Sequence, residues 1–79
     1  MVKVYVPLIE REFDIYIPIN KKIGIIKKII INTINEITEL NLQERRPVKL
    51  YDKVTGLSFD NEIYVKDSSI RNGTQLILL

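Results

Sequence analysis

The longest regular pattern of apolar positions in this chain runs from Asn20 to Leu40. Isoleucines recur there at steps of three and four residues, which places them on one side of a helix. Lysines, asparagines and a glutamate fall on the opposite side. The isoleucines of this stripe are Ile23, Ile26, Ile30, Ile34 and Ile37. The pattern predicts one amphipathic helix, with Asn20 as its N-cap and Asn41 as a left-handed C-cap.

Two segments before this helix alternate apolar and polar residues, as half-buried strands do. In Met1–Pro7 the three valines share one face, and in Glu12–Ile19 the inward positions are Phe13, Ile15 and Ile17. Only the short segment Leu8–Arg11 separates them. This arrangement predicts a hairpin.

Further strands are predicted after the helix and a polar surface linker at 41–47. They are Val48–Tyr51, a short edge strand at Leu57–Phe59, and Gln75–Leu79. The last of these is apolar on both faces, so we expect it in the middle of the sheet, beside the first strand and parallel to it. Residues 60–69 lie between the last two predicted strands, and we expect them to form an irregular crossing in which Ile63 and Val65 enter the core. Ile70 is a further apolar residue that we expect to anchor this segment to the core.

These elements predict a single α+β domain over residues 1–79. A mixed sheet of four to five strands would pack on one long helix, because each strand offers one apolar face and the helix one apolar stripe.

The amino-acid composition limits which catalytic and metal-binding groups the protein can offer. The 79 residues include no cysteine and no histidine, which removes disulfides, thiolate metal sites and the commonest general base. The carboxylates Glu10, Glu12 and Asp14 are candidates for catalysis, but outward-facing charges beside a turn are usually solvated surface. Asp60, Glu62 and Asp67 are candidates for a cation site, but their spacing matches no calcium loop, and we interpret them as solvated surface too. We therefore expect no catalytic residue, no metal and no cofactor, and we expect the protein not to be an enzyme.

Charge and hydropathy bear on the cellular location of the protein and on the partners it could bind. The formal net charge of +2 is too balanced to indicate nucleic acid by itself. No apolar run reaches the length of a membrane span or of a signal peptide core. We expect a cytoplasmic protein that does not insert into membranes.

Four features carry a resemblance to a known superfamily: the seven-residue first strand, the hairpin into DIYIP, the helix entry IPINKKIGIIKKI, and the ending SSIRNGTQLILL. With the element order, they resemble ubiquitin and the β-grasp superfamily over essentially the whole chain. The typical ubiquitin-like ending corresponds to Asp67–Leu79, with Ile70, Leu76 and Leu78 in its apolar slots. The resemblance implies a ubiquitin-like β-grasp fold.

Within that superfamily the chain is similar to the small bacterial YukD/EsaB family in length and in the spacing from Ile70 to Gly73. This resemblance implies a cytosolic accessory or regulatory component of a type VII (ESX-like) secretion system. Thr74 departs from the family, whose members more often place aspartate after the glycine.

The chemistry of ubiquitin-like modifiers and sulfur carriers uses a flexible tail that ends in two glycines. This sequence has no pair of adjacent glycines and stops at Leu79, inside the predicted last strand. We therefore expect no covalent conjugation. A modifier or sulfur carrier whose tail is absent from this sequence stays open as an alternative.

Two surfaces are candidates for partner binding. The first is the outward face of the sheet, which in ubiquitin is the main binding surface, and its residues are Lys3, Tyr5, Lys49, Tyr51, Ile77 and Leu79. We expect a protein partner there, and an exposed apolar face also allows a homodimer. The second is a basic patch at the helix start, Lys21, Lys22, Lys27 and Lys28, which leaves a nucleic-acid-binding accessory protein as an alternative.

Overall fold

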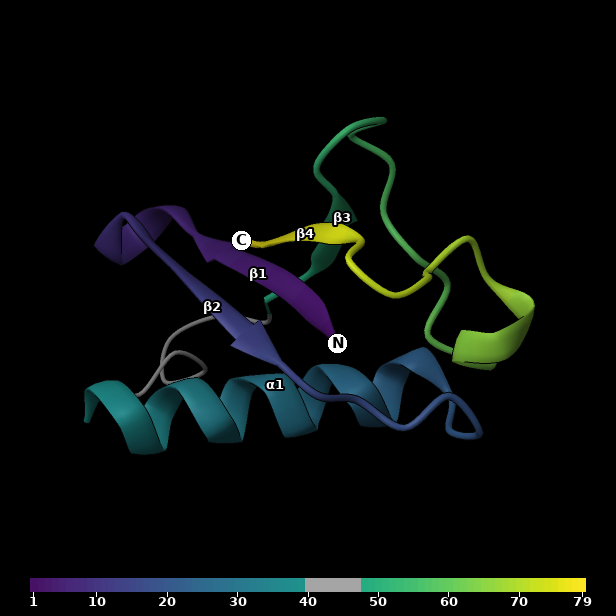
Figure 1. Ribbon diagram of the computed structural model, residues 1–79, viewed down its shortest axis with the longest axis horizontal. Helices are drawn as coiled ribbons and strands as arrows, with labels where there is room; N and C mark the ends of the chain where they lie inside the picture. Colours follow the sequence, from purple (N-terminus) through teal and green to yellow (C-terminus); the bar gives the residue numbers. More distant parts are fainter. Residues whose placement is uncertain (40–47) are drawn as a thin grey trace.

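The computed structural model describes residues 1–39 and 48–79 of the chain. A mixed sheet and one helix form two layers, with α1 running across one face of the sheet (Figure 1). The elements are β1 Val2–Val6, β2 Arg11–Ile15, α1 Ile23–Thr38, β3 Leu50–Asp52 and β4 Gln75–Leu78, with 3₁₀ turns η1 Pro7–Ile9 and η2 Val65–Asp67. The predicted linker at 41–47 lies outside the described residues.

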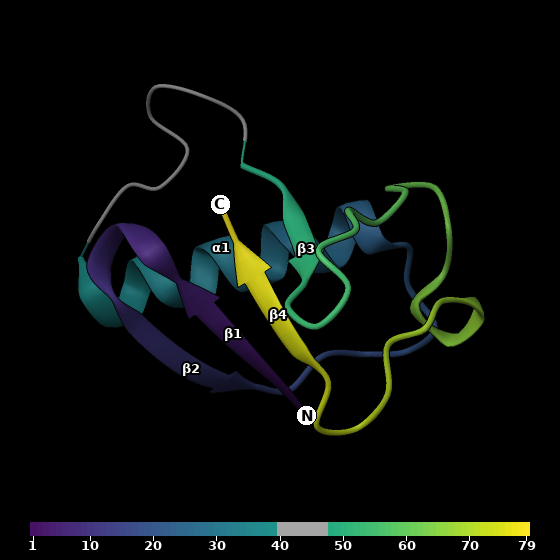
Figure 2. The same cartoon turned by 90° about the horizontal axis from the view of Figure 1, so that it is seen from above.

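The sheet has four strands in the order β2-β1-β4-β3 (Figure 2). The β1–β2 and β3–β4 pairs are antiparallel, whereas β1 and β4 are parallel. The hairpin and the central, parallel last strand are therefore confirmed. The predicted edge strand Leu57–Phe59 is reduced to a single antiparallel bridge between Ser58 and Tyr51. Two hydrogen bonds form it, from the Asp52 N–H to the Leu57 carbonyl at 2.9 Å and from the Phe59 N–H to the Leu50 carbonyl at 3.2 Å.

The second strand is shorter than predicted. It ends at Ile15, which pairs with Val2, the first residue of β1. Beyond that pair the chain leaves the sheet and runs toward the start of α1. Ile17 remains half-buried against the core, whereas Ile19 is 64% exposed.

The core lies between the sheet and the helix and is wholly apolar among the described residues. From the sheet it takes the three valines of β1, two residues of β2, Leu50, Leu76 and Leu78, and from the helix Ile23, Ile26, Ile30, Ile31 and Ile34; Val48, Val65 and Ile70 complete it. Val65 and Ile70 are thus confirmed as anchors.

Two core assignments from sequence were wrong, and one core residue of the helix was not predicted. Ile37 is 55% exposed, because it lies in the last helical turn, beyond the last buried position of α1. Ile63 is 41% exposed, although its backbone carbonyl accepts a hydrogen bond from the Ile23 N–H at the helix start. Ile31 is fully buried although it lies off the predicted stripe, so the buried arc of the helix is wider than that stripe.

The helix does not begin at the predicted N-cap, Asn20. Lys22 occupies the cap position without a side-chain hydrogen bond. Instead, the backbone N–H of Ile23 donates to the carbonyl of Ile63 at 2.8 Å, and the N–H of Gly24 donates to the carbonyl of Asn61 at 3.0 Å. A distant loop thus satisfies the amides that a cap residue would otherwise hold.

Gly24 permits this close approach. A Cβ atom at this position would lie 3.3 Å from both the Cβ and the carbonyl oxygen of Asn61. At the other end, Glu39 adopts the left-handed conformation with φ 60 and its N–H donates to the carbonyl of Asn35. Glu39 therefore ends the helix, and the predicted cap Asn41 lies outside the described residues.

Candidate functional site

The outer face of the sheet, turned away from α1, carries a row of large side chains. Strand alternation places Tyr5 between two buried valines and Ile77 between two buried leucines. The strand register then sets Tyr5 opposite Ile77, and Ile77 opposite Tyr51. We call these three half-buried residues the Tyr–Ile–Tyr row; it crosses β1, β4 and β3, which lie in front of the helix in Figure 2.

Lys49 and Leu79 extend this surface beyond one side of the row. Their backbones exchange two hydrogen bonds, from the Lys49 N–H to the Leu79 carbonyl at 3.0 Å and from the Leu79 N–H to the Lys49 carbonyl at 2.9 Å. They therefore continue the β3–β4 pairing on the same face as the row. Leu79 is 48% exposed and Lys49 is exposed, so both side chains are accessible.

Lys3 lies on the other side of the row, where it is engaged within the molecule. Its Nζ atom lies 3.0 Å from Oδ1 of Asp14, the residue opposite it on β2. This hydrogen bond, with the negative charge of Asp14, raises the pKa of Lys3 above its usual value. The structure thus brings all six predicted residues to one face, but Lys3 already has an acidic partner there.

Lys53 belongs to this surface and was missed from the sequence. Its Nζ atom lies 5.3 Å from the centroid of the Tyr5 ring, within the range of a cation–π contact. Its backbone N–H donates to the carbonyl of Gln75 at 3.0 Å, so the β3–β4 pairing continues past Asp52. Extending the alternation of Lys49 and Tyr51 by two residues would have found it.

The predicted basic patch is only partly assembled. Lys22, Lys27 and Lys28 line one recess at the start of α1, and Glu62 lines it with them. The Lys22 Nζ lies 3.1 Å from Oε2 of Glu62, and this hydrogen bond raises the pKa of Lys22. Lys21 does not line the recess.

The helix start offers little to an anion. The N–H groups of Ile23 and Gly24 donate to loop carbonyls, and those of Ile25 and Ile26 both donate to the carbonyl of Lys22. Phosphate binding at a helix N-terminus uses such amides when they are free. The lysines would therefore have to act through their side chains alone.

The acidic residues have local structural contacts. Asp14 pairs with Lys3, and Oδ1 of Asp60 accepts the backbone N–H of Glu62 at 2.9 Å. Within residues 1–39 and 48–79, no three acidic side chains come together as a metal site would require. In the same residues, no helix has both the length and the apolar character needed to span a membrane.

Neither protein-family models nor curated protein sequences match this chain. The structure itself defines the class as a small α+β protein with a four-stranded mixed sheet and one helix.

Proposed function

We propose that this protein is a ubiquitin-like β-grasp domain that binds another protein non-covalently through the outer face of its sheet. The observation that carries this proposal is the Tyr–Ile–Tyr row, in which the register aligns Tyr5, Ile77 and Tyr51 across three strands. The β-grasp fold is supported by the central parallel pair, flanked by antiparallel strands, with one helix across the sheet.

The row has the composition of a protein-binding surface. Aromatic side chains are enriched in such interfaces, because they contribute large contact areas while few rotatable bonds become fixed. Each member is anchored in a paired strand and is half-buried before any partner arrives. Lys49 and Lys53, both exposed beside the row, would orient a partner by charge.

The cellular setting is part of the same proposal: a cytoplasmic, bacterial accessory or regulatory component of a type VII secretion system, as the YukD/EsaB resemblance implies. Two residues of that resemblance have clear structural roles. Ile70 is 4% exposed in the core, and Gly73 has φ +86, which favours glycine. Because both roles concern packing and turn geometry, they support the fold more directly than the setting.

The experiment is recovery of the tagged full-length protein from its own host, compared on native and denaturing gels. We expect a large native complex that releases this chain at about 9.2 kDa on denaturation. Tyr51→Ala and Ile77→Asp should each abolish the complex. Ile37→Asp is the matched control, because Ile37 is exposed on the helix and lies outside the row.

Several outcomes would reject the proposal. A ladder that survives denaturation would show covalent conjugation, and intact complexes with both row variants would exclude the sheet face. Co-purified nucleic acid, lost steeply between low and moderate salt, would favour the basic patch instead. The identity of the co-purified chains would confirm or exclude the proposed role in a secretion system. Recovery of this chain alone at twice its mass would indicate a homodimer.

A further inference from the structure

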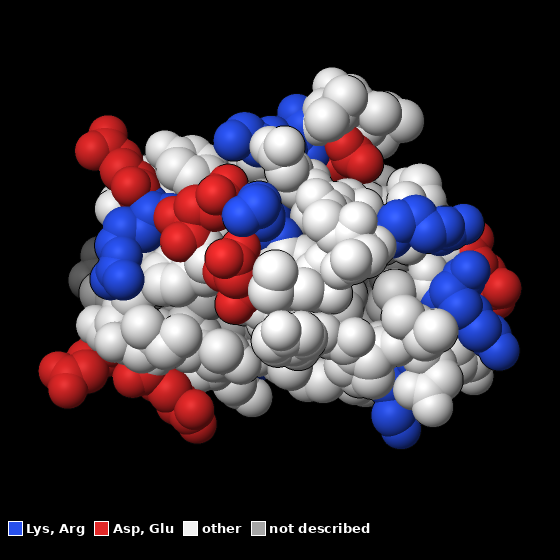
Figure 3. All heavy atoms as spheres, viewed as in Figure 1, with Lys and Arg blue, Asp and Glu red and all other residues white. Residues whose placement is uncertain are grey.

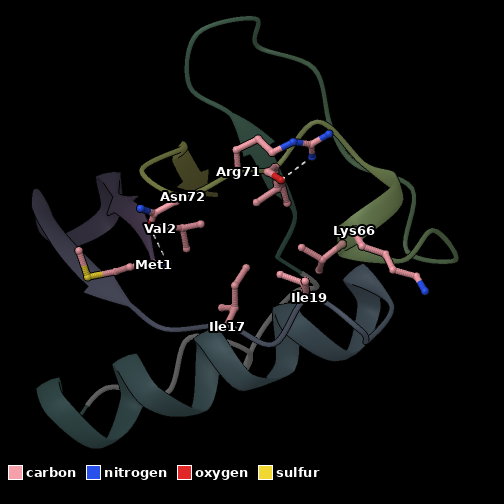
Figure 4. A pocket seen from close by; sticks show the side chains of 9 residues that line it. Met1, Val2, Ile17, Ile19, Lys66, Arg71 and Asn72 are labelled. Carbon is pink, nitrogen blue, oxygen red and sulfur yellow. Dashed lines mark hydrogen bonds between the residues drawn. The ribbon is translucent and has the colours of Figure 1, made fainter.

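A second surface, separate from the outer sheet face, is a groove of about 390 Å³. It lies between the segment that joins β2 to α1 and the segment that leads from η2 to β4 (Figure 4). Its lining residues are Met1, Val2, Ile17, Ile19, Val65, Lys66, Ile70, Arg71 and Asn72. None of them belongs to the Tyr–Ile–Tyr row or to its flanks.

Backbone hydrogen bonds fix both walls of the groove. At one end, the N–H of Lys66 donates to the carbonyl of Ile19 at 3.0 Å. At the other end, the N–H of Gly73 donates to the carbonyl of Met1 at 2.7 Å. A ligand would therefore meet a preformed site and would not have to order it, which lowers the entropic cost of binding.

The lining combines a buried apolar floor with an exposed apolar rim. Val2, Val65 and Ile70 are core residues, whereas Ile19 is 64% exposed and Met1 is 40% exposed. Figure 4 shows Val2 and Ile17 projecting into the space between the walls. Isoleucine exposed to this degree beside an open cavity is apolar surface that a partner's side chain could remove from water.

The charge at the rim has one sign. Lys66 and Arg71 are the charged side chains among the lining residues, and both are cationic. The guanidinium of Arg71 lies at the outer edge of the rim (Figure 4), where Nη1 donates to the carbonyls of Ser68 at 2.7 Å and Ile70 at 2.8 Å. In Figure 3 the middle of this side of the molecule is largely uncharged, and several basic side chains and an acidic one border it on the right.

We propose that this groove binds a short acidic segment of a partner protein. One bulky apolar side chain of the segment would lie between the wall that carries Ile17 and Ile19 and the wall that carries Ile70. An adjacent aspartate or glutamate would reach Lys66 and Arg71 at the rim. The volume is near the lower end for ligand pockets, which suits one or two side chains. The protein would then have two independent docking surfaces, the second of them selective for negative charge.

The test is a titration of the ¹⁵N-labelled full chain, followed by amide chemical shifts. The probe is an acetylated and amidated five-residue peptide with a central phenylalanine, a leucine on each side of it and an aspartate at each end. The matched peptide carries lysines in place of the aspartates. We expect the acidic peptide to shift the amides of Ile17, Ile19, Lys66 and Asn72, leave those of Tyr51 and Ile77 in place, and bind about tenfold more tightly than the basic one.

Two pairs of variants test the assignment. Ile19→Ser and Lys66→Glu should each weaken binding of the acidic peptide by about fivefold or more. The control for the first is Ile37→Ser, an equal loss of an exposed isoleucine on the helix, and for the second Lys28→Glu, an equal charge reversal on the helix. Neither control residue lines the groove, and neither variant should change the affinity.

The proposal is overturned if the acidic peptide produces no shifts at millimolar concentration, if the two peptides bind equally, or if the shifts centre on the Tyr–Ile–Tyr row. Sodium octanoate tests a small amphiphilic anion as the occupant. If octanoate fills the groove at lower concentration than the peptide and with the same dependence on Lys66, the site is one for a small carboxylate and the peptide proposal fails.

Discussion

The two faces of β4 carry neighbouring residues of similar hydrophobicity in opposite situations. Leu76 faces the helix and is 0% exposed, whereas Ile77 faces outward and is half-buried between two tyrosines. Hydropathy alone does not distinguish them. What distinguishes them is that α1 covers one face of the sheet and none of the described residues forms a second layer on the other.

The composition of the two faces differs accordingly. The inner face is built from aliphatic residues and one phenylalanine, and no buried polar residue occurs in the described core. The outer face mixes tyrosine and lysine with aliphatic residues. Tyrosine places a polar hydroxyl at the end of an apolar ring, so it tolerates both water and a partner. The inner face is thus suited to permanent packing and the outer face to reversible contact.

The largest expected effect tests this comparison within β4 itself. Leu76→Ala should lower the free energy of unfolding by about 2–5 kcal/mol, because it leaves a cavity in the centre of the core. Ile77→Ala should cost about 1 kcal/mol, because part of that side chain is already in water. Urea denaturation followed by circular dichroism measures both values. Equal costs would show that the outer face is as tightly packed as the inner one.

A second pair extends the comparison to the helix. Ile31→Ala should cost about 2–4 kcal/mol, because this side chain is fully buried. Ile37→Ala should change stability by about 0.5 kcal/mol or less, as surface substitutions do. Alanine favours the helix at both positions, so propensity does not explain a difference. The helical period alone would predict a larger loss of stability for Ile37→Ala than for Ile31→Ala. That result would show that Ile37 is packed in the core.

The smallest effect concerns the charges on the outer face. The hydrogen bond from Lys3 to Asp14 raises the pKa of Lys3 in the folded protein, so its contribution to stability is complete below the unfolded value near 10.5. That contribution is lost as pH rises through the folded pKa. The stability difference between the native chain and Lys3→Met, measured by urea denaturation, should therefore shrink above pH 10.5.

Asp14→Asn is the control, since it removes the same ion pair from the other side and should abolish the same pH dependence. Because both groups are exposed, added salt should reduce the effect. A stability difference that stays constant across this pH range would show that the pair does not contribute in solution.

Much of the fold could be predicted because alternation and helical periodicity are local properties. The valines of β1 identified an inward face, and a last strand apolar on both sides identified the middle of the sheet. The helix start could not be predicted, because the groups that cap it are the carbonyls of Asn61 and Ile63, which folding brings to Ile23 and Gly24.

The candidate site was likewise predicted only in part from the sequence. The six residues of the sheet face were found from strand parity, and their alignment followed from the strand order. Lys53 was missed because its segment reads as a turn, although its backbone still pairs with Gln75. The groove was missed because its walls come from two segments well separated in the sequence, and residues 16–19 were interpreted as the end of a strand.

The central position of β4 has a consequence for how the chain reaches this structure. Its partner β1 lies at the opposite end of the described sequence, so the middle of the sheet depends on contacts of long sequence separation. Such contacts raise the contact order and slow folding relative to a helical protein of equal size. During synthesis, β1 and β2 would leave the ribosome as a hairpin with one edge of β1 unpaired. The sheet would close only after β4 emerges, and until then that edge is exposed to other chains.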